Sequence, residues 1–231
     1  MGLFSSAKDK KSQQREQLFR RLKEAIPQGD VGSISYAIMN IRQARLLGDP
    51  EMPLLLNSAI TTVSNKSLSE GLGMAIWALT SLSDETLVKS TIAKTFNLIA
   101  RADRNNMRTM ASVAMAANTI ASTAENGSED QKRAKREWLA AYDTLAAKSD
   151  GLQFAFAAAS NAAVGFADMP LRSVAIDKWE QSVLKLAASS RYSAEREAHR
   201  VASGYDDFES GTTAFRNRAA SVLGKLRNTK P

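Results

Sequence analysis

His199 is the only histidine of this chain, and there are no cysteines. A Ser-His-Asp catalytic site would have to use His199, while disulfides, zinc fingers, iron–sulfur clusters and a cysteine nucleophile are excluded. The residues around it, Glu195, Arg196, Glu197 and Arg200, form a charged stretch that is typical of a surface. An arginine also stands where the Glu-x-x-His pair of a di-iron bundle would need a glutamate. We therefore expect an exposed histidine with no metal and no catalytic role.

Glycine-based and other catalytic motifs are also missing. The sequence contains no Gly-x-x-x-x-Gly-Lys-Ser/Thr, no Gly-x-Gly-x-x-Gly, no His-Glu-x-x-His and no Gly-x-Ser-x-Gly. Gly71 and Gly73 lie inside an expected helix, where they indicate close packing between helices. The sequence predicts a protein that is not an enzyme, uses no cofactor or metal, and takes no small-molecule substrate.

Positive charge gathers at the two ends of the chain. The net charge is +7, and residues 1–24 and 216–231 hold seven and five basic residues against three and no acidic ones. Basic ends are typical of proteins that contact an anionic membrane surface or a phosphate backbone. Solubility alone is the alternative explanation. The candidate contact residues are Lys8, Lys10, Lys11, Arg15, Arg20, Arg21 and Lys23 at one end, and Arg216, Arg218, Lys225, Arg227 and Lys230 at the other.

Gly2 is a candidate lipidation site. Together with Ser6 it fits the myristoylation pattern Met-Gly-x-x-x-Ser/Thr. One myristoyl chain binds a membrane only marginally, and the lysines that follow would supply the second signal. Leu3 and Phe4 could enter the membrane interface even without a lipid. Acylation of Gly2 depends on a host that has the acylating enzyme.

A second group of basic residues lies inside the chain. Arginine side chains suit phosphate, because their planar fork donates two parallel hydrogen bonds. Acidic neighbours offset these residues, so a solvated face with local salt bridges is the alternative to phosphate binding. The candidates are Arg101, Arg104 and Arg108, which share one face if a helix runs unbroken there, and Lys132, Arg133, Lys135 and Arg136.

Helix is expected almost throughout, because alanine is abundant and runs of alternating apolar and polar residues are absent. The fold class is all-α, a compact multi-helix bundle of about ten to eleven helices, with stacked helical hairpins as the alternative. Ser67 to Glu70 and Ser128 to Gln131 fit the capping box. Further helix starts are expected at Ser12, Ser33, Asp49, Ser83, Asp150, Asp168 and Ser193, and stops or loops at Pro27, Gly48, Gly127, Gly204 and Gly211.

Three parts of the chain are expected: a basic amphipathic segment at 1–27, a helical body at 28–211 with a sub-boundary near 125–128, and a basic C-terminal helix and tail at 212–231. Residues 107–124 and 152–167 are so rich in small and apolar residues that we expect them to be central core helices. The expected core aromatic residues are Trp77, Phe96, Trp138, Phe154, Phe156 and Trp179.

In composition, though not in any motif, the chain is similar to small viral matrix and nucleocapsid proteins. The favoured hypothesis is a structural, matrix-like assembly protein that self-associates and docks on an anionic membrane through its basic ends, as in a virion. No signal peptide and no transmembrane stretch is recognised, so we expect a cytoplasmic protein peripheral to a membrane. The alternatives are an RNA- or DNA-binding nucleocapsid or shell protein and, with less support, an adaptor or effector with a protein-binding helical groove.

Overall fold

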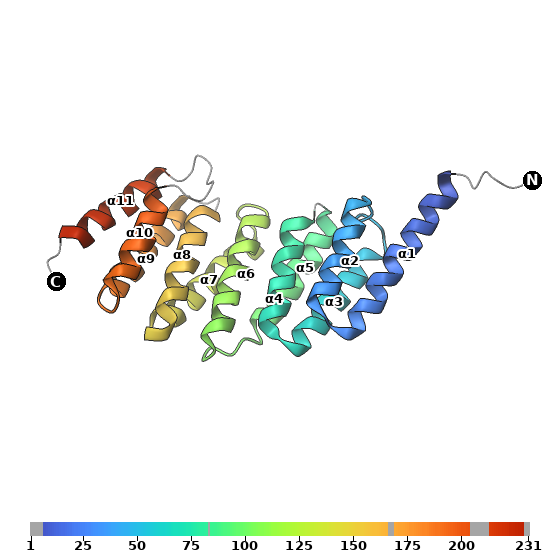
Figure 1. The fold of residues 1–231 in the computed structure, drawn as a ribbon, viewed down its shortest axis with the longest axis horizontal. Helices are drawn as coiled ribbons and strands as arrows, with labels where there is room; N and C mark the ends of the chain where they lie inside the picture. The colour runs from blue at the N-terminus through green and yellow to red at the C-terminus, as the bar shows by residue number, and fades with distance from the viewer. Residues whose placement is uncertain (1–6, 83, 166–168, 204–212, 229–231) are drawn as a thin grey trace, which may run out of the picture. The chain divides into compact units, whose positions relative to one another are not determined.

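The protein is helical along its described length. The computed structural model describes residues 7–82, 84–165, 169–203 and 213–228, which form eleven α-helices, one 3₁₀ helix and no strand (Figure 1). Within these ranges no helix has the length and apolar character required to cross a bilayer. The chain divides into two units, residues 1–101 and 102–231.

The first unit contains five helices. They are α1 (Ala7–Gln28), α2 (Val31–Gln43), α3 (Met52–Lys66), α4 (Leu68–Ser81) and α5 (Glu85–Ile99). The helix α1 packs on α2 and α3, α4 packs on α2, α3 and α5, and α3 also contacts α5. Aliphatic side chains dominate the core between them, including Leu22, Ile34, Ile38, Ile41, Leu56, Ile60 and Leu72.

The second unit contains the remaining helices. They are α6 (Met107–Thr123), α7 (Glu129–Ala146), the 3₁₀ helix η1 (Ser149–Gly151), α8 (Leu152–Gly165), α9 (Met169–Ala187), α10 (Arg191–Ala202) and α11 (Thr213–Asn228). The helices α6, α7 and α8 pack on one another, α8 contacts α9, and α9, α10 and α11 form a second packed group.

The all-α multi-helix bundle is confirmed. Inside each unit most helices contact the next helix in sequence, and several also contact the helix after next, as α1 contacts α3 and α6 contacts α8, which is the contact pattern of stacked helical hairpins. The loop at 125–128 joins α6 to α7 within the second unit. The division into residues 1–27, 28–211 and 212–231 stays a prediction.

Serine N-caps form at both expected positions, although the reciprocal half of each capping box does not, because the amides of Ser67 and Ser128 donate to the carbonyls of Val63 and Glu125. The Ser67 hydroxyl accepts a hydrogen bond from the backbone amide of Glu70 at the start of α4, and the Ser128 hydroxyl accepts one from the backbone amide of Gln131 at the start of α7. The side chain of Gln131 is buried. Its Oε1 accepts a hydrogen bond from the backbone amide of Gly127, and its Nε2 donates one to the backbone carbonyl of Ala121. Gly127 has a φ of +77°, a conformation that glycine adopts without a steric penalty. This loop is therefore closed by polar contacts that the sequence pattern predicts in part.

Other helix starts were predicted at the wrong residue. The carboxylate of Asp30 caps α2 by accepting the amide of Ser33, and Ser190 caps α10 by accepting the amide of Ser193. In both cases a polar residue three positions earlier provides the cap, because the N-cap oxygen must reach the amide of the third helical residue. The helix α1 begins at Ala7 rather than Ser12 and runs one residue past Pro27. The helix α3 begins at Met52 rather than beside Asp49, and Asp150 lies in η1 instead of starting an α-helix. Ser83, Asp168, Gly204 and Gly211 lie outside the described residues.

The core prediction holds for three of the six aromatic residues. Phe96, Trp138 and Trp179 are at most 2% exposed, whereas Trp77, Phe154 and Phe156 are only half-buried. In α8 the reason is visible in its own sequence. Alanines make up most of its buried face, so the phenylalanines lie at the edges. The alanines of that face are Ala155, Ala158, Ala159, Ala162 and Ala163.

Gly71 allows α4 to approach α3 closely, whereas Gly73 faces open space. A Cβ atom at Gly71 would lie 2.4 Å from Cβ and 2.7 Å from Cα of Ser64, and one at Gly73 would meet nothing within 4 Å. We expect Gly71→Ala to lower the free energy of unfolding by about 1–3 kcal/mol through overpacking. Gly73→Ala, the matched control, should raise it by about 0.5–1 kcal/mol through helix propensity. Urea unfolding measures both, and equal effects of the two substitutions would contradict the close approach.

Candidate functional site

The N-terminal half of α1 carries the lysine cluster. The helix begins at Ala7, so the backbone of Lys8, Lys10 and Lys11 is helical, although their side chains lie outside the described residues, as does all of Gly2. The described side chains between residues 12 and 18 are exposed or half-buried, and the first buried one is Phe19. In Figure 1 this end of α1 extends beyond α2 and α3. The basic segment is thus the continuation of a packed helix.

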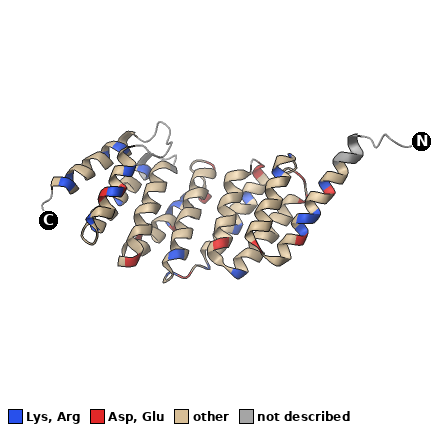
Figure 2. Ribbon diagram, in the orientation of Figure 1, with Lys and Arg blue, Asp and Glu red and all other residues tan. Residues whose placement is uncertain are grey.

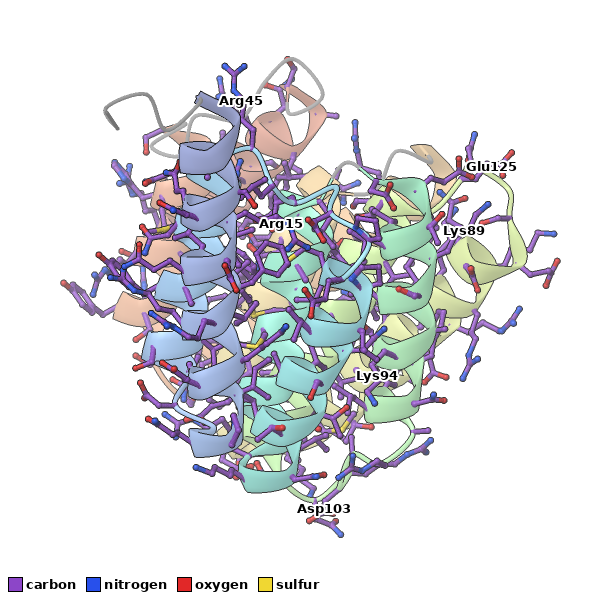
Figure 3. The ribbon with its side chains drawn as sticks, turned by 90° about the vertical axis from the view of Figure 1, so that its right-hand side faces the viewer. Arg15, Arg45, Lys89, Lys94, Asp103 and Glu125 are labelled. Atoms are coloured by element: carbon purple, nitrogen blue, oxygen red, sulfur yellow. The ribbon has the colours of Figure 1, made fainter. Side chains whose placement is uncertain are left out.

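Two of the basic residues of α1 are engaged inside the first unit. Arg15 donates two hydrogen bonds to the carboxylate of Asp49, from Nε at 2.5 Å and from Nη2 at 2.8 Å, and its guanidinium lies over the ring of Phe19. Figure 3 shows Arg15 between α1 and the segment that leads into α3. The hydrogen bonds from Arg15 hold the pKa of Asp49 below its ordinary value. Lys23 forms an ion pair with Glu51 on the same segment. These contacts fix α1 against the connection between α2 and α3.

The other two described basic residues of α1 face solvent. Arg20 lies 3.9 Å from Glu24 one turn later, with both side chains about two-thirds exposed, so this pair contributes little stability. Arg21 is exposed and makes no ion pair with any residue that the structure describes. Arg20 and Arg21 therefore remain accessible to an external anion.

At the C-terminal end, the basic residues hold α11 against α9. Glu180 of α9 accepts hydrogen bonds from Arg218 at 2.5 Å and from Lys225 at 2.7 Å, and Arg218 also lies 3.2 Å from Asp177. Beneath this cluster Trp179 meets the ring of Phe215 edge-on. Figure 2 shows acidic and basic residues together on α9 and basic residues alone on α11. Of the other candidates at this end, Arg216 is half-buried, Arg227 is exposed, and Lys230 lies outside the described residues.

Removal of the Glu180 charge should destabilise the second unit. Burial raises the pKa of Glu180, but the hydrogen bonds from Lys225 and Arg218 outweigh burial, so the pKa lies below its ordinary value. Because the carboxylate is favoured in the folded state, its contribution is present at neutral pH and is lost as the pH falls through the folded-state pKa. We expect Glu180→Gln to lower the free energy of unfolding by about 1.5–3 kcal/mol at pH 7, the range for hydrogen bonds to charged groups. Denaturant unfolding across pH checks this, and a difference between the two proteins that persists unchanged into acid would contradict it.

The internal arginines do not share one helical face. The helix α5 ends at Ile99 and α6 begins at Met107, so Arg101 and Arg104 lie in the loop and Arg108 in the first turn of α6. The side chain of Asn106 caps the start of α6. No single helix therefore runs from Arg101 to Arg108, as a shared face of the three arginines would require. The basic residues of α7 share a single helix. Lys132, Arg133 and Arg136 are exposed and Lys135 is half-buried, and Lys132 pairs with Glu129 at 2.9 Å.

His199 is exposed, as predicted from its charged neighbours. Groups of three or more metal-ligating side chains do not occur in the part of the chain that the structure describes. Sequence reasoning missed a cavity beside His199, between α8, α9 and α10. The available signal was the spacing of Tyr192, Arg196 and His199, which places an aromatic and two nitrogen-rich side chains on one side of α10.

No protein-family model, curated protein or solved structure matches the chain. We therefore infer a function from the fold and from the charges of the residues that the structure describes.

Proposed function

We propose that the protein is a non-enzymatic helical assembly protein that docks on an anionic membrane surface through the N-terminal end of α1. The observation that carries this proposal is the continuity of α1. The helix begins at Ala7, beside the lysine cluster, and its buried residues begin only at Phe19. A basic helix end that projects from a packed body can lie along a charged surface without unfolding anything else.

The distribution of engaged and accessible cations supports the same end of the chain. Arg218 and Lys225 are paired with Glu180, so their charge stabilises the fold. The lysine cluster, by contrast, precedes the packed part of α1, and each lysine near an anionic surface contributes about 1 kcal/mol of attraction. We therefore assign docking to the N-terminal end and a mainly structural role to the C-terminal cluster, in place of docking through both basic ends.

Self-association completes this proposal. Tyr36 and Met39 lie one turn apart on α2 and are 60% and 45% exposed. Apolar side chains that neighbour each other on a surface are typical of protein contacts. We expect copies of the chain to associate through this face of α2. Tyr36→Glu should therefore lower the molecular mass measured by sedimentation relative to that of the unmodified chain.

Vesicle flotation and nucleic-acid mobility shifts, run in parallel on the purified full chain, test the proposal. We expect recovery with vesicles that contain phosphatidylserine, and release of the protein at high salt because exposed charges are screened. A steep salt-dependent shift of single-stranded RNA, without vesicle binding, would replace the membrane by nucleic acid. The test variant has Lys8, Lys10 and Lys11 replaced by glutamate. Its matched control has Lys132, Arg133 and Arg136 on α7 replaced by glutamate, which reverses the same number of charges elsewhere in the chain.

A further inference from the structure

A cavity of about 710 Å³ lies in the second unit, between α8, α9 and α10. Its volume falls within the range of small-molecule sites, about 300–1,000 Å³. Residues from three helices line it, so it is built by tertiary packing. The lining residues are Gln153, Phe156, Leu186, Tyr192, Ser193, Arg196, Glu197, His199 and Arg200.

The polar wall of the cavity contains one fixed and neutralised ion pair. Glu197 is 8% exposed and accepts from Nε and Nη2 of Arg200, both at 3.0 Å, and from the indole of Trp179 at 3.4 Å. Arg200 also donates to the hydroxyl of the buried Ser160 at 3.2 Å. This network ties α10 to α8 and α9 and leaves little net charge at Arg200.

Arg196 and His199 provide the unbalanced donors. They lie one turn apart on α10, both are exposed, and neither side chain makes a hydrogen bond or ion pair with a residue that the structure describes. Both acidic residues that flank Arg196 in sequence are engaged elsewhere, Glu195 with Arg191 at 2.8 Å and Glu197 with Arg200 at 3.0 Å. The guanidinium of Arg196 and the ring N–H of His199 are therefore available to one external anionic group.

The rest of the lining is apolar. Phe156 of α8 and Leu186 of α9 are half-buried, and Tyr192 is 75% exposed. An aliphatic or aromatic body that covers these side chains removes apolar surface from water at roughly 25 cal/mol per Å². Two available donors beside an apolar wall suit a ligand with a single anionic group at one end.

We propose that this cavity binds an organic anion with an apolar body, its carboxylate or phosphate between Arg196 and His199 and its body against Phe156 and Leu186. A free fatty acid and a single-chain phospholipid share this chemistry. The site lies in the second unit, away from the sequence of α1, so it does not depend on the proposed docking of the N-terminal end.

Anilinonaphthalene sulfonate, an aromatic anion that becomes fluorescent in apolar sites, is the probe. The purified full chain should bind it saturably, and Arg196→Gln should weaken binding by about tenfold or more, the loss typical of a hydrogen bond to a charged group. Leu186→Ser should also weaken binding, whereas Arg136→Gln on α7, an exposed arginine outside the cavity, should not. Thermal unfolding followed by circular dichroism verifies that each variant is folded.

Displacement of the probe distinguishes the ligand classes. Decanoate and lysophosphatidate should both displace it if the site takes either anion, and displacement by one alone identifies the group. Decanol and inorganic phosphate should displace it poorly, because each provides only half of the required chemistry. The proposal is overturned by displacement with decanol as strong as with decanoate, by unchanged binding to folded Arg196→Gln, or by an absence of saturable binding. A variant with Lys8, Lys10 and Lys11 reversed should bind the probe normally, which separates this site from membrane docking.

Discussion

Replacement of Lys8, Lys10 and Lys11 by glutamine is expected to weaken binding to anionic vesicles by about 100-fold. Each lysine contributes about 1 kcal/mol near such a surface, and every 1.4 kcal/mol changes the affinity tenfold. Replacement by glutamate adds repulsion to the lost attraction, so binding should fall below detection. Vesicle titration in low salt measures both changes.

The fold should survive these substitutions, because the buried residues of α1 begin only at Phe19. Circular dichroism and unfolding midpoints equal to those of the unmodified chain would verify this. Reversal of Lys132, Arg133 and Arg136 on α7 should leave vesicle binding within a few fold. Equal losses from the two reversals would show that net charge, rather than the end of α1, determines binding.

Replacement of Phe96 by alanine is expected to lower the free energy of unfolding by about 3–5 kcal/mol, the usual cost of removing a buried aromatic side chain and leaving a cavity. Phe96 is 2% exposed and lies on α5, which packs on α3 and α4. Val88→Ala is the control on the same helix. Val88 is only half-buried, and we expect a loss of about 1 kcal/mol or less.

Urea unfolding at neutral pH provides both values if the slope of free energy against denaturant stays constant. A loss below 1 kcal/mol at Phe96 would mean that α5 does not present this side chain to the core. A similar loss at Val88 and Phe96 would mean that the loss does not follow burial, because alanine has a higher helix propensity than either residue and cannot lower stability through propensity.

The helices could be predicted from the sequence because their signals are local. Ser67 and Ser128 each lie three residues before the residue whose amide they accept a hydrogen bond from, and both serines cap their helices as the pattern predicts. The start of α2 was misplaced because Asp30 and Ser33 are both good capping residues, and only the path of the chain decides which of them lies outside the helix. Capping chemistry therefore predicts that a helix starts nearby more reliably than the residue at which it starts.

The engagement of the basic ends could not be predicted, because it depends on residues far apart in sequence. Arg15 meets Asp49 across 34 positions, and Glu180 meets Arg218 and Lys225 across 38 and 45 positions. A count of charges treats these cations as accessible, although they stabilise the packing of helices. The cavity beside His199 escaped prediction for the same reason, since side chains of α8 and α9 complete it.

A single fluorescent label on α1 tests the docking proposal most directly. The chain has no cysteine, so Ser12→Cys creates one labelling position on the exposed part of α1, and Ser58→Cys creates a matched exposed position on α3. With an environment-sensitive dye and phosphatidylserine vesicles, we expect a blue shift of emission at position 12, none at position 58, and loss of the shift at high salt. An unchanged emission at position 12 while the protein floats with the vesicles, or a shift at position 58 alone, would contradict docking through the N-terminal end of α1.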